Sequence, residues 1–286
     1  MKTESYSTGG HVRLRVENVA GTVSVVTTDD RLTEVGVSSE RADSSLVEGT
    51  RIGLQSSGDV HDVQVIVPKP NKTSLFRREE VRITVRLPHG ADLDIETVSA
   101  DVEAAGRYGE VRVRTVSGDA TVDAADGVYV QSVSGDVSVG EVADGLEVHT
   151  VSGDSIGGRV GGASRVTSTS GDVRLGALER RAEVESVSGD LHVDVVNDGI
   201  SVSTVSGDLR VKCATGGEVR SKTVSGDLTI GVAPGHPVRV DAHSRSGEVS
   251  SEIPLNDSPT TVPGEAGSGI TIIAESLSGD IRIVAA

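Results

Sequence analysis

The stretch Thr115-Val116-Ser117-Gly118-Asp119, followed at residues 132–136 by Ser-Val-Ser-Gly-Asp, decides the fold of this chain. The pentapeptide recurs almost to the C-terminus, and its acidic residues are 17 to 19 positions apart through Asp227. Weaker copies end at Asp101 and Glu248, and a last full copy ends at Asp280. Self-similarity at a fixed short period indicates a repeat protein in which each repeat packs against its neighbours.

Alignment of the repeats on the acidic residue separates inward from outward positions. The positions eight and six before it are small or aliphatic, as at Val111 and Val113, and so is the position after it, as at Val137. Between them, outward positions such as Arg112 and Tyr129 vary freely. This period-2 alternation predicts two strands per repeat, each with one buried face. Equivalent strands would stack in parallel ~4.8 Å apart.

The expected fold is therefore all-β: a single-stranded parallel β-helix, or β-solenoid, with about 18 residues per rung. We expect right-handed winding, because crossovers between twisted parallel strands are right-handed. The repeats are assigned to residues 91–286. Five prolines between residues 233 and 269 predict a loop insertion there. The last rung, which begins at Ile270, is the most apolar one, so we expect it to be covered or paired.

Residues 1–90 are β-rich but lack the repeat. Alternation over residues 11–26 predicts two half-buried strands joined by a turn through residues 18–21. A strong strand is predicted over residues 81–87, where valine, isoleucine and leucine alternate with polar residues. We interpret this region as an irregular β-rich N-terminal cap, because the open end of a solenoid must be covered.

The Gly-Asp turn of each repeat has two interpretations. Stacked carboxylates could collect Ca²⁺, although known calcium-binding repeats need a richer glycine loop. We favour a structural turn in which glycine adopts a positive φ and aspartate accepts backbone N–H groups in an Asx-type turn. The structural turn ladder comprises Gly118, Asp119, Gly135, Asp136, Gly153, Asp154, Gly171, Asp172, Gly189, Asp190, Gly207, Asp208, Gly226, Asp227, Gly279 and Asp280.

Two hydroxyl columns flank an apolar column in the same pentapeptide. The hydroxyl groups could form a repetitive ligand-binding face, but we favour hydrogen bonds along the ladder at the corner. The apolar column has the opposite parity to the buried columns, so it is either turned inward at the corner or exposed as a stripe. We favour corner packing, because long exposed stripes promote aggregation. Exposure would instead favour lateral association. The apolar column comprises Val98, Val116, Val133, Val151, Thr169, Val187, Val205, Val224 and Leu277.

Composition excludes several classes of protein. The chain has 27 Lys and Arg against 43 Asp and Glu, a net charge of −16, and 1% aromatic residues, so we expect no nucleic-acid partner. Cys213 is the only cysteine, and no long apolar run or leader is visible. We expect no membrane span and a cytoplasmic protein, or a surface-associated one if a leader is missing. Net acidity alone indicates solubility.

We predict no catalytic, cofactor-binding or metal-binding residues, and no cofactor. The seven histidines lack metal-ligand spacing, and no phosphate-binding or nucleophile motif is present. The alternative is a β-helix carbohydrate-active enzyme, a lyase or hydrolase of acidic polysaccharides that uses paired carboxylates. Its site would use the one concentration of titratable groups: His236, Arg239, Asp241, His243, Glu248, Glu252 and Asp257.

The repeated pentapeptides, the turn at residues 19–23 and the segment Leu87-Pro88-His89-Gly90-Ala91 resemble the bacterial DUF4097 family of β-strand-repeat "putative adhesin" domains. The resemblance covers roughly residues 12–284. It implies a single-stranded β-helix and a non-catalytic, adhesin-like role, with no ligand residues that can be transferred to this chain. We therefore expect a scaffold or interaction module with an unknown protein or cell-envelope partner, or one that self-associates through its end or edge.

Overall fold

The computed structural model describes residues 1–41, 43–69, 79–253 and 269–286. It confirms the all-β prediction, since helix in these residues is limited to α1 (Ser45–Gly49). Ser44 caps α1, and its hydroxyl group accepts a 3.1 Å hydrogen bond from the backbone N–H of Val47. No helix in the described ranges is long and apolar enough to cross a bilayer.

The chain forms two compact units. The first comprises Met1–Ala143 and Val148–Gly153, and the second comprises Asp144–Glu147 and Asp154–Ala286. The predicted boundary at residue 90 is a different division and stays a prediction. The first unit contains β1 (Lys2–Ser7), β2 (His11–Thr28), β3 (Leu32–Ser39), β4 (Arg51–Ser57), β5 (Val60–Ile66), β6 (Val81–Pro88), β7 (Asp92–Arg114) and β8 (Ala120–Ser132), and β9 (Val137–Ser152) is divided between the units.

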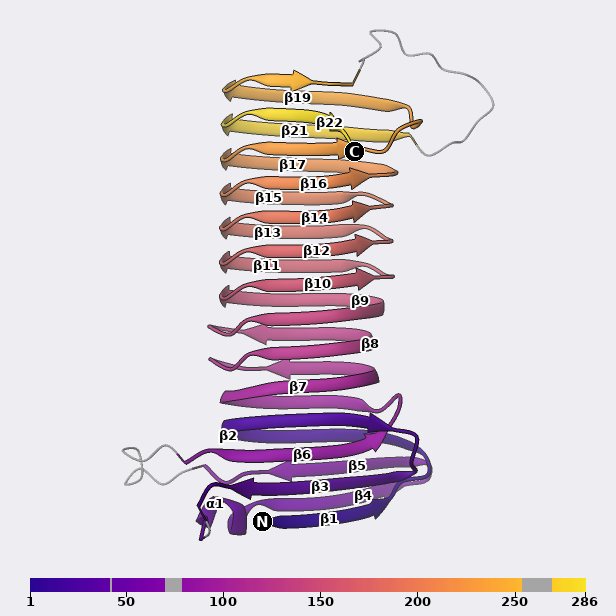
Figure 1. Cartoon of the computed structure of the whole chain (residues 1–286), viewed down its shortest axis with the longest axis vertical. Helices are drawn as coiled ribbons and strands as arrows, with labels where there is room; N and C mark the ends of the chain where they lie inside the picture. Colours follow the sequence, from indigo (N-terminus) through magenta and orange to yellow (C-terminus); the bar gives the residue numbers. More distant parts are fainter. Residues whose placement is uncertain (42, 70–78, 254–268) are drawn as a thin grey trace. The chain divides into compact units, whose positions relative to one another are not determined.

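The second unit consists of short strands joined by tight turns (Figure 1). Its first strands are β10 (Ser155–Val160), β11 (Ser164–Ser170), β12 (Val173–Leu178), β13 (Ala182–Ser188), β14 (Leu191–Val196), β15 (Ile200–Ser206), β16 (Leu209–Ala214), β17 (Gly217–Ser225) and β18 (Leu228–Val232). Four more complete it: β19 (Val238–Ser246), β20 (Val249–Ser251), β21 (Ile270–Ser278) and β22 (Ile281–Ala285).

Alternate strands of the second unit pair in parallel. β11, β13, β15 and β17 form one ladder, and β10, β12, β14, β16 and β18 form another. The register places equivalent repeat positions side by side, such as Val184 with Val202 and Leu191 with Leu209. These inward side chains are at most 4% exposed, so the inward columns seen in the sequence are the core of this unit.

The last strands do not follow chain order. β21 pairs with both β17 and β19, and β22 pairs with both β18 and β20. The apolar final repeat is thus inserted between two earlier ones, which explains why Ile270, Ile272 and Ile281 are at most 1% exposed. The predicted loop insertion at residues 233–269 is not a loop throughout, because β19 and β20 lie within it, at the weak repeat that ends at Glu248. Residues 254–268 of the insertion lie outside the described residues. The alternation of Val238, Val240 and Ala242 overrides the prolines around it.

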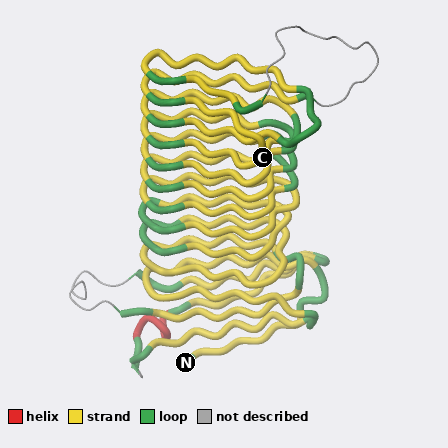
Figure 2. The backbone as a smooth tube through the Cα atoms, turned by 45° about the horizontal axis from the view of Figure 1, so that its top comes forward, coloured by secondary structure: helices red, strands yellow, loops and turns green. Residues whose placement is uncertain are grey.

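The start of the chain is also inserted between later strands. β2 is one continuous strand, bent at Gly21 (φ 117°), where two strands joined by a turn were predicted. It pairs in parallel with β7, and on its other edge its two halves pair in parallel with β5 and β6. Residues 11–28 therefore belong to the parallel array. Figure 2 shows that the loops, drawn in green, gather at the corners where the stacked strands turn.

Antiparallel strands complete the first unit. β3 pairs with β6, β4 pairs with β5, and β1 pairs with β3. The strand predicted over residues 81–87 is β6, whose inward residues Val81, Ile83, Val85 and Leu87 are at most 1% exposed. These strands cover one edge of the parallel array of the first unit with antiparallel strands.

Candidate functional site

The aspartates of the turn link successive repeats. In the second unit the backbone N–H groups of Asp190, Asp208 and Asp227 each donate to Oδ1 of the aspartate one repeat earlier, at 2.8 to 3.0 Å. In the first unit Asp136 donates to Asp119 in the same way, at 2.9 Å. The sequence suggested hydrogen bonds within each turn, whereas the structure places them between turns. One oxygen of each of these carboxylates therefore already accepts a hydrogen bond from a backbone N–H group.

The column of turn aspartates, all of them among the described residues, forms no cluster of the kind that holds Ca²⁺. Among the residues that the structure describes, no group of three or more His, Cys, Asp or Glu side chains is placed to hold a metal ion. The second carboxylate oxygen of some turn aspartates contacts arginine instead, as in the 3.2 Å pair of Arg174 and Asp172 and the 2.9 Å pair of Arg282 and Asp280.

The glycine of the turn is required by the close stacking of repeats. Gly207 has a φ of 132°, and a Cβ atom there would clash with the carbonyl oxygen of Gly189. Gly118 lacks a positive φ, but a Cβ atom at this position would clash with the carbonyl oxygen of Ala100. The predicted positive φ is thus found at some repeats only, whereas the lack of room for a side chain is common to both positions.

Most hydroxyl groups four positions before the acid are buried, and some of them bind the corner of their own repeat. Thr97 Oγ1 donates to the carbonyl oxygen of Ala100 at 3.1 Å, and Thr115 Oγ1 accepts from the N–H of Gly118 at 3.0 Å. Such bonds are not made at every corner, since the buried hydroxyl groups of Thr150, Ser168 and Ser276 have no hydrogen-bond partner in the described structure. The expected bonds along the ladder are also present: Ser117 Oγ donates to the carbonyl oxygen of Val98 at 3.3 Å, and Ser244 Oγ donates to that of Gly279 at 2.9 Å. The bonded side chains help to hold the bend.

The apolar column is exposed, so the prediction of corner packing was wrong. Its large side chains are 42% to 50% exposed in both units. Thr115 and Gly118 turn inward at the corner, and the residue after Thr115 must then point outward. We call this column the valine ladder: Val98, Val116, Val133 and Val151 in the first unit, and Val187, Val205, Val224 and Leu277 in the second.

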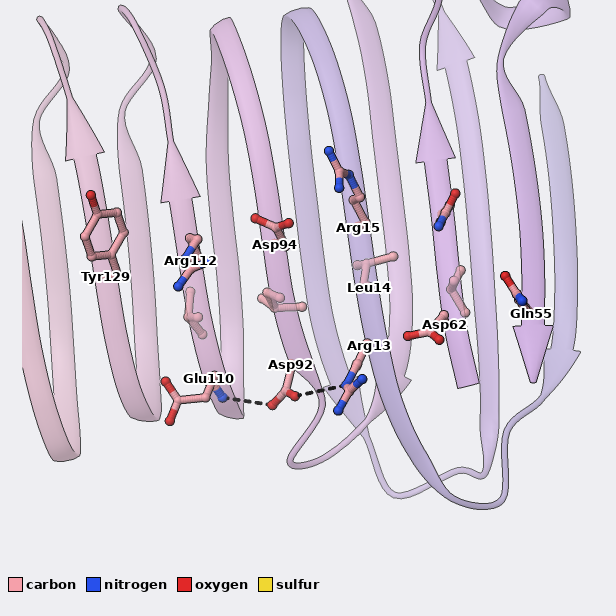
Figure 3. A pocket seen from close by; sticks show the side chains of 14 residues that line it. Arg13, Leu14, Arg15, Gln55, Asp62, Asp92, Asp94, Glu110, Arg112 and Tyr129 are labelled. Carbon is pink, nitrogen blue, oxygen red and sulfur yellow. Dashed lines mark hydrogen bonds and ion pairs between the residues drawn. The ribbon is translucent and has the colours of Figure 1, made fainter. Parts of the chain in front are cut away.

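A hollow of about 420 Å³ lies on the outer face of the first unit (Figure 3). Strands β4, β5, β2, β7 and β8 contribute to it, and their outward side chains form two rows. One row runs from Gln64 through Arg15, Asp94 and Arg112 to Tyr129. The other contains Gln55, Asp62, Arg13, Asp92 and Glu110. We call this site the outer-face hollow.

Arginines and carboxylates are mixed in the outer-face hollow. Asp92 Oδ2 lies 3.8 Å from Arg13 Nε and 2.8 Å from His11 Nε2, and Asp92 Oδ1 accepts the backbone N–H of Glu110 at 3.0 Å. Asp94 Oδ1 has an Arg114 guanidinium nitrogen at 3.8 Å but no hydrogen-bond partner. The guanidinium of Arg112 lies 5.6 Å from the centre of the Tyr129 ring.

Sequence reasoning missed the outer-face hollow. Its residues occupy outward positions, and the variable positions Arg112 and Tyr129 were recognised only as solvent-facing. The hollow depends on the pairing of β2 with β5 and β7, which brings together residues 49 positions apart, such as Arg15 and Gln64, and 79 positions apart, such as Arg15 and Asp94. No local pattern could reveal that pairing. The available signal was the alternation of apolar and polar residues over residues 11–26, which is the same alternation as in the repeats.

The residues of the expected enzyme site are not gathered in a loop. Arg239, Asp241 and His243 are exposed, outward positions of strand β19. Glu248 and Glu252 are also exposed, next to β20. His236 precedes β19, and Asp257 lies outside the described residues.

The model of the Toastrack DUF4097 family matches residues 11–284, nearly the whole chain. The chain belongs to this family. The match begins at the first residue of β2, so it includes the N-terminal segment that pairs with β7 as well as the repeats. No protein with a curated description is similar in sequence to this Toastrack chain.

Three solved structures align with this Toastrack chain along nearly their whole length. A "putative adhesin" from Bacteroides fragilis NCTC 9343 is 14% identical over 99% of this chain and 96% of its own, with a TM-score of 0.41. A "putative cell adhesion protein" from Clostridium sporogenes ATCC 15579 is 10% identical over 100% and 99%, with a TM-score of 0.30. A "putative lipid binding protein" from Parabacteroides distasonis ATCC 8503 is 11% identical over 99% and 96%, with a TM-score of 0.34. Each name describes that protein alone.

Proposed function

We propose that this protein is a non-catalytic, adhesin-like interaction module that associates laterally with a second copy of itself through the valine ladder. The observation that carries the proposal is the exposure of this ladder, 42% to 50% at each valine or leucine. Contiguous exposed apolar patches on soluble proteins mark interaction sites. Burial of such side chains against a partner would remove apolar surface from water and favour association.

A second copy matches the ladder because both ladders have the same spacing. Backbone bonds from Ser117 to Val98 and from Ser134 to Val116 show that successive ladder residues lie on adjacent turns of the chain. Their separation is then that of neighbouring strands, ~4.8 Å. Two copies can therefore interdigitate their ladders side by side without any change of shape.

The end of the second unit is less suited to association than its ladder. Within the described residues β19 pairs with β21 alone, and its outward positions are charged or polar. At the ladder position of this strand stands the exposed Arg245. Charged side chains on an edge strand oppose pairing with another sheet. We therefore propose association through the edge formed by the ladder, and not end to end.

We further infer that the repeats form a right-handed β-solenoid of about 18 residues per turn. The hydrogen bonds between aspartates 18 residues apart in the second unit support this period. The right hand is supported by the general preference of parallel crossovers. Such a solenoid repeats the ladder position once per turn, which is what a continuous contact edge requires.

Light scattering coupled to size-exclusion chromatography tests the function. The combined variant Val187→Thr, Val205→Thr and Val224→Thr should shift the protein toward the monomer, because hydroxyl groups replace methyl groups in the contact. Threonine suits this column, as Thr169 already occupies it and is exposed. The matched control is Ile156→Thr, since Ile156 is 46% exposed but lies outside the ladder.

Two results would contradict the proposal. One is a wild-type protein that stays monomeric at every concentration. The other is equal association of the wild type and the triple variant, which would place the contact elsewhere. Circular dichroism and urea unfolding should show both variants folded, because exposed substitutions change stability by about 0.5 kcal/mol or less.

The non-catalytic part of the proposal has its own test. Arg239, Asp241 and His243 are spread along one exposed strand, which supports a charged edge better than an active site. Incubation with polygalacturonate should give no shortened or unsaturated products. Product formation that is lost in Asp241→Asn would contradict the proposal and favour the carbohydrate-active enzyme.

A further inference from the structure

We propose that the outer-face hollow of the first unit is a binding site for a neutral, linear glycan. The proposal is independent of the valine ladder, which lies at the corners of the repeats, whereas the hollow lies on outward strand positions. Its volume of about 420 Å³ falls within the size range of small-molecule sites. Five strands supply its lining, so the site is held by sheet hydrogen bonds and not by loops.

The charges of the outer-face hollow favour a neutral ligand. Three arginines, Arg13, Arg15 and Arg112, face four carboxylates, those of Asp62, Asp92, Asp94 and Glu110. The two signs are interleaved, and pairs such as Arg13 with Asp92 at 3.8 Å partly neutralise each other. A strongly anionic ligand would meet these carboxylates and a chain of net charge −16. A polyhydroxylated ligand needs no surplus of either sign.

Unused hydrogen-bonding groups point to hydroxyl-bearing ligands. The Asp94 side chain is 39% exposed, and its Oδ1 is the buried oxygen, without a hydrogen bond in the described residues, so a ligand would meet the other oxygen. The guanidinium of Arg112 contacts the ring of Tyr129. Figure 3 shows Asp94 between Arg112, on the second half of β7, and Arg15 on β2. A carboxylate is a double acceptor and a guanidinium a double donor. Together they can bind the neighbouring hydroxyl groups of a sugar, which act as both donors and acceptors.

The spacing of the row favours a linear chain of sugars. The row is formed by successive passes of the chain, ~4.8 Å apart: Gln64 on β5, Arg15 on β2, Asp94 and Arg112 on the two halves of β7, and Tyr129 on β8. A pyranose unit in an extended β-linked chain advances by roughly one such strand spacing. Each sugar would therefore meet one side chain of the row. Tyr129, the last residue of this row in the hollow, has Arg112 5.6 Å and the His149 ring 5.8 Å from its ring centre, and the exposed part of its ring can contact a sugar.

Isothermal titration of the whole protein with three soluble oligosaccharides tests the proposal. Cellohexaose and chitohexaose are neutral, linear and β-linked, and hexagalacturonate is the acidic comparison. We expect at least one neutral probe to bind with a Kd of about 1 mM or tighter. We expect hexagalacturonate to bind at least about tenfold more weakly.

Two substitutions locate the binding. Asp94→Asn and Tyr129→Ala should each weaken it about tenfold, the first by removal of a charged acceptor and the second by loss of the ring. The control is Asp194→Asn on β14, since Asp194 also faces outward beside basic side chains, with His192 at 3.4 Å and Lys212 at 3.9 Å, but lies outside the hollow. This control should bind like the wild type.

Each remaining result overturns the proposal. Failure of both neutral probes to bind would exclude this ligand class. Preference for hexagalacturonate would show that the charge argument is wrong. Unchanged binding by Asp94→Asn and Tyr129→Ala, with both variants folded by circular dichroism, would place the sugar elsewhere. Loss of self-association in the ladder variants bears on none of these outcomes, so the two proposals can fail separately.

Discussion

At the scale of single residues, Tyr108 is a polar anchor inside a core built mainly from valine, isoleucine, leucine and alanine. It is fully buried, and its hydroxyl group lies 2.8 Å from the carbonyl oxygen of Val25 and 2.9 Å from that of Ala105. Tyr108→Phe should lower the free energy of unfolding by about 1–2 kcal/mol, because buried carbonyl groups lose their donor. Urea unfolding measures the change. Tyr129→Phe is the control, since its partly exposed ring can leave the hydroxyl group to water, and an equal loss in both variants would contradict the prediction.

The same residue gives the protein a pH dependence in alkali. Burial raises the pKa of Tyr108, and the nearby carboxylate of Asp123 raises it further. The unfolded chain ionises this phenol above pH ~10, while the folded chain keeps it neutral. The stabilisation is thus complete below pH ~10 and declines above it, by at most about 1.4 kcal/mol per pH unit. The difference in unfolding free energy between wild type and Tyr108→Phe should therefore shrink as the pH rises above ~10.

At the scale of elements, the inserted C-terminal strands fasten the end of the second unit. β22 lies between β18 and β20, and Ile283 is 1% exposed there. Ile283→Ala should cost about 2–5 kcal/mol through the cavity that it leaves. Hydrogen exchange should accelerate first in β18, β20 and β22. Val284→Ala, at the less buried neighbouring position, is the control, and equal exchange in the two variants would show that the strand does not act as a fastener.

At the scale of the whole molecule, the sequence repeat predicted the structure within each repeat and missed the pairings between distant segments. The inward columns, for example Val184 and Val202, were visible because each repeat specifies its own alternation. The insertion of β2 beside β7, and of β21 beside β17, depends on pairing between distant segments. The outer-face hollow follows from the first of these pairings. The side chains of the valine ladder point outward because of the backbone geometry at each corner. The alternation of apolar and polar residues describes strands and does not describe corners.

The net charge of the whole chain governs how the valine ladder can act. At −16 two copies repel each other, and this repulsion opposes the apolar contact. Added salt shortens the screening length from ~30 Å at 0.01 M to ~8 Å at 0.15 M, so self-association should strengthen as sodium chloride is raised. Sedimentation velocity at both salt concentrations measures this. The variant with threonine at residues 187, 205 and 224 should remain monomeric in both. Dissociation on addition of salt would instead indicate a contact between opposite charges, and the ladder would then not be the interface.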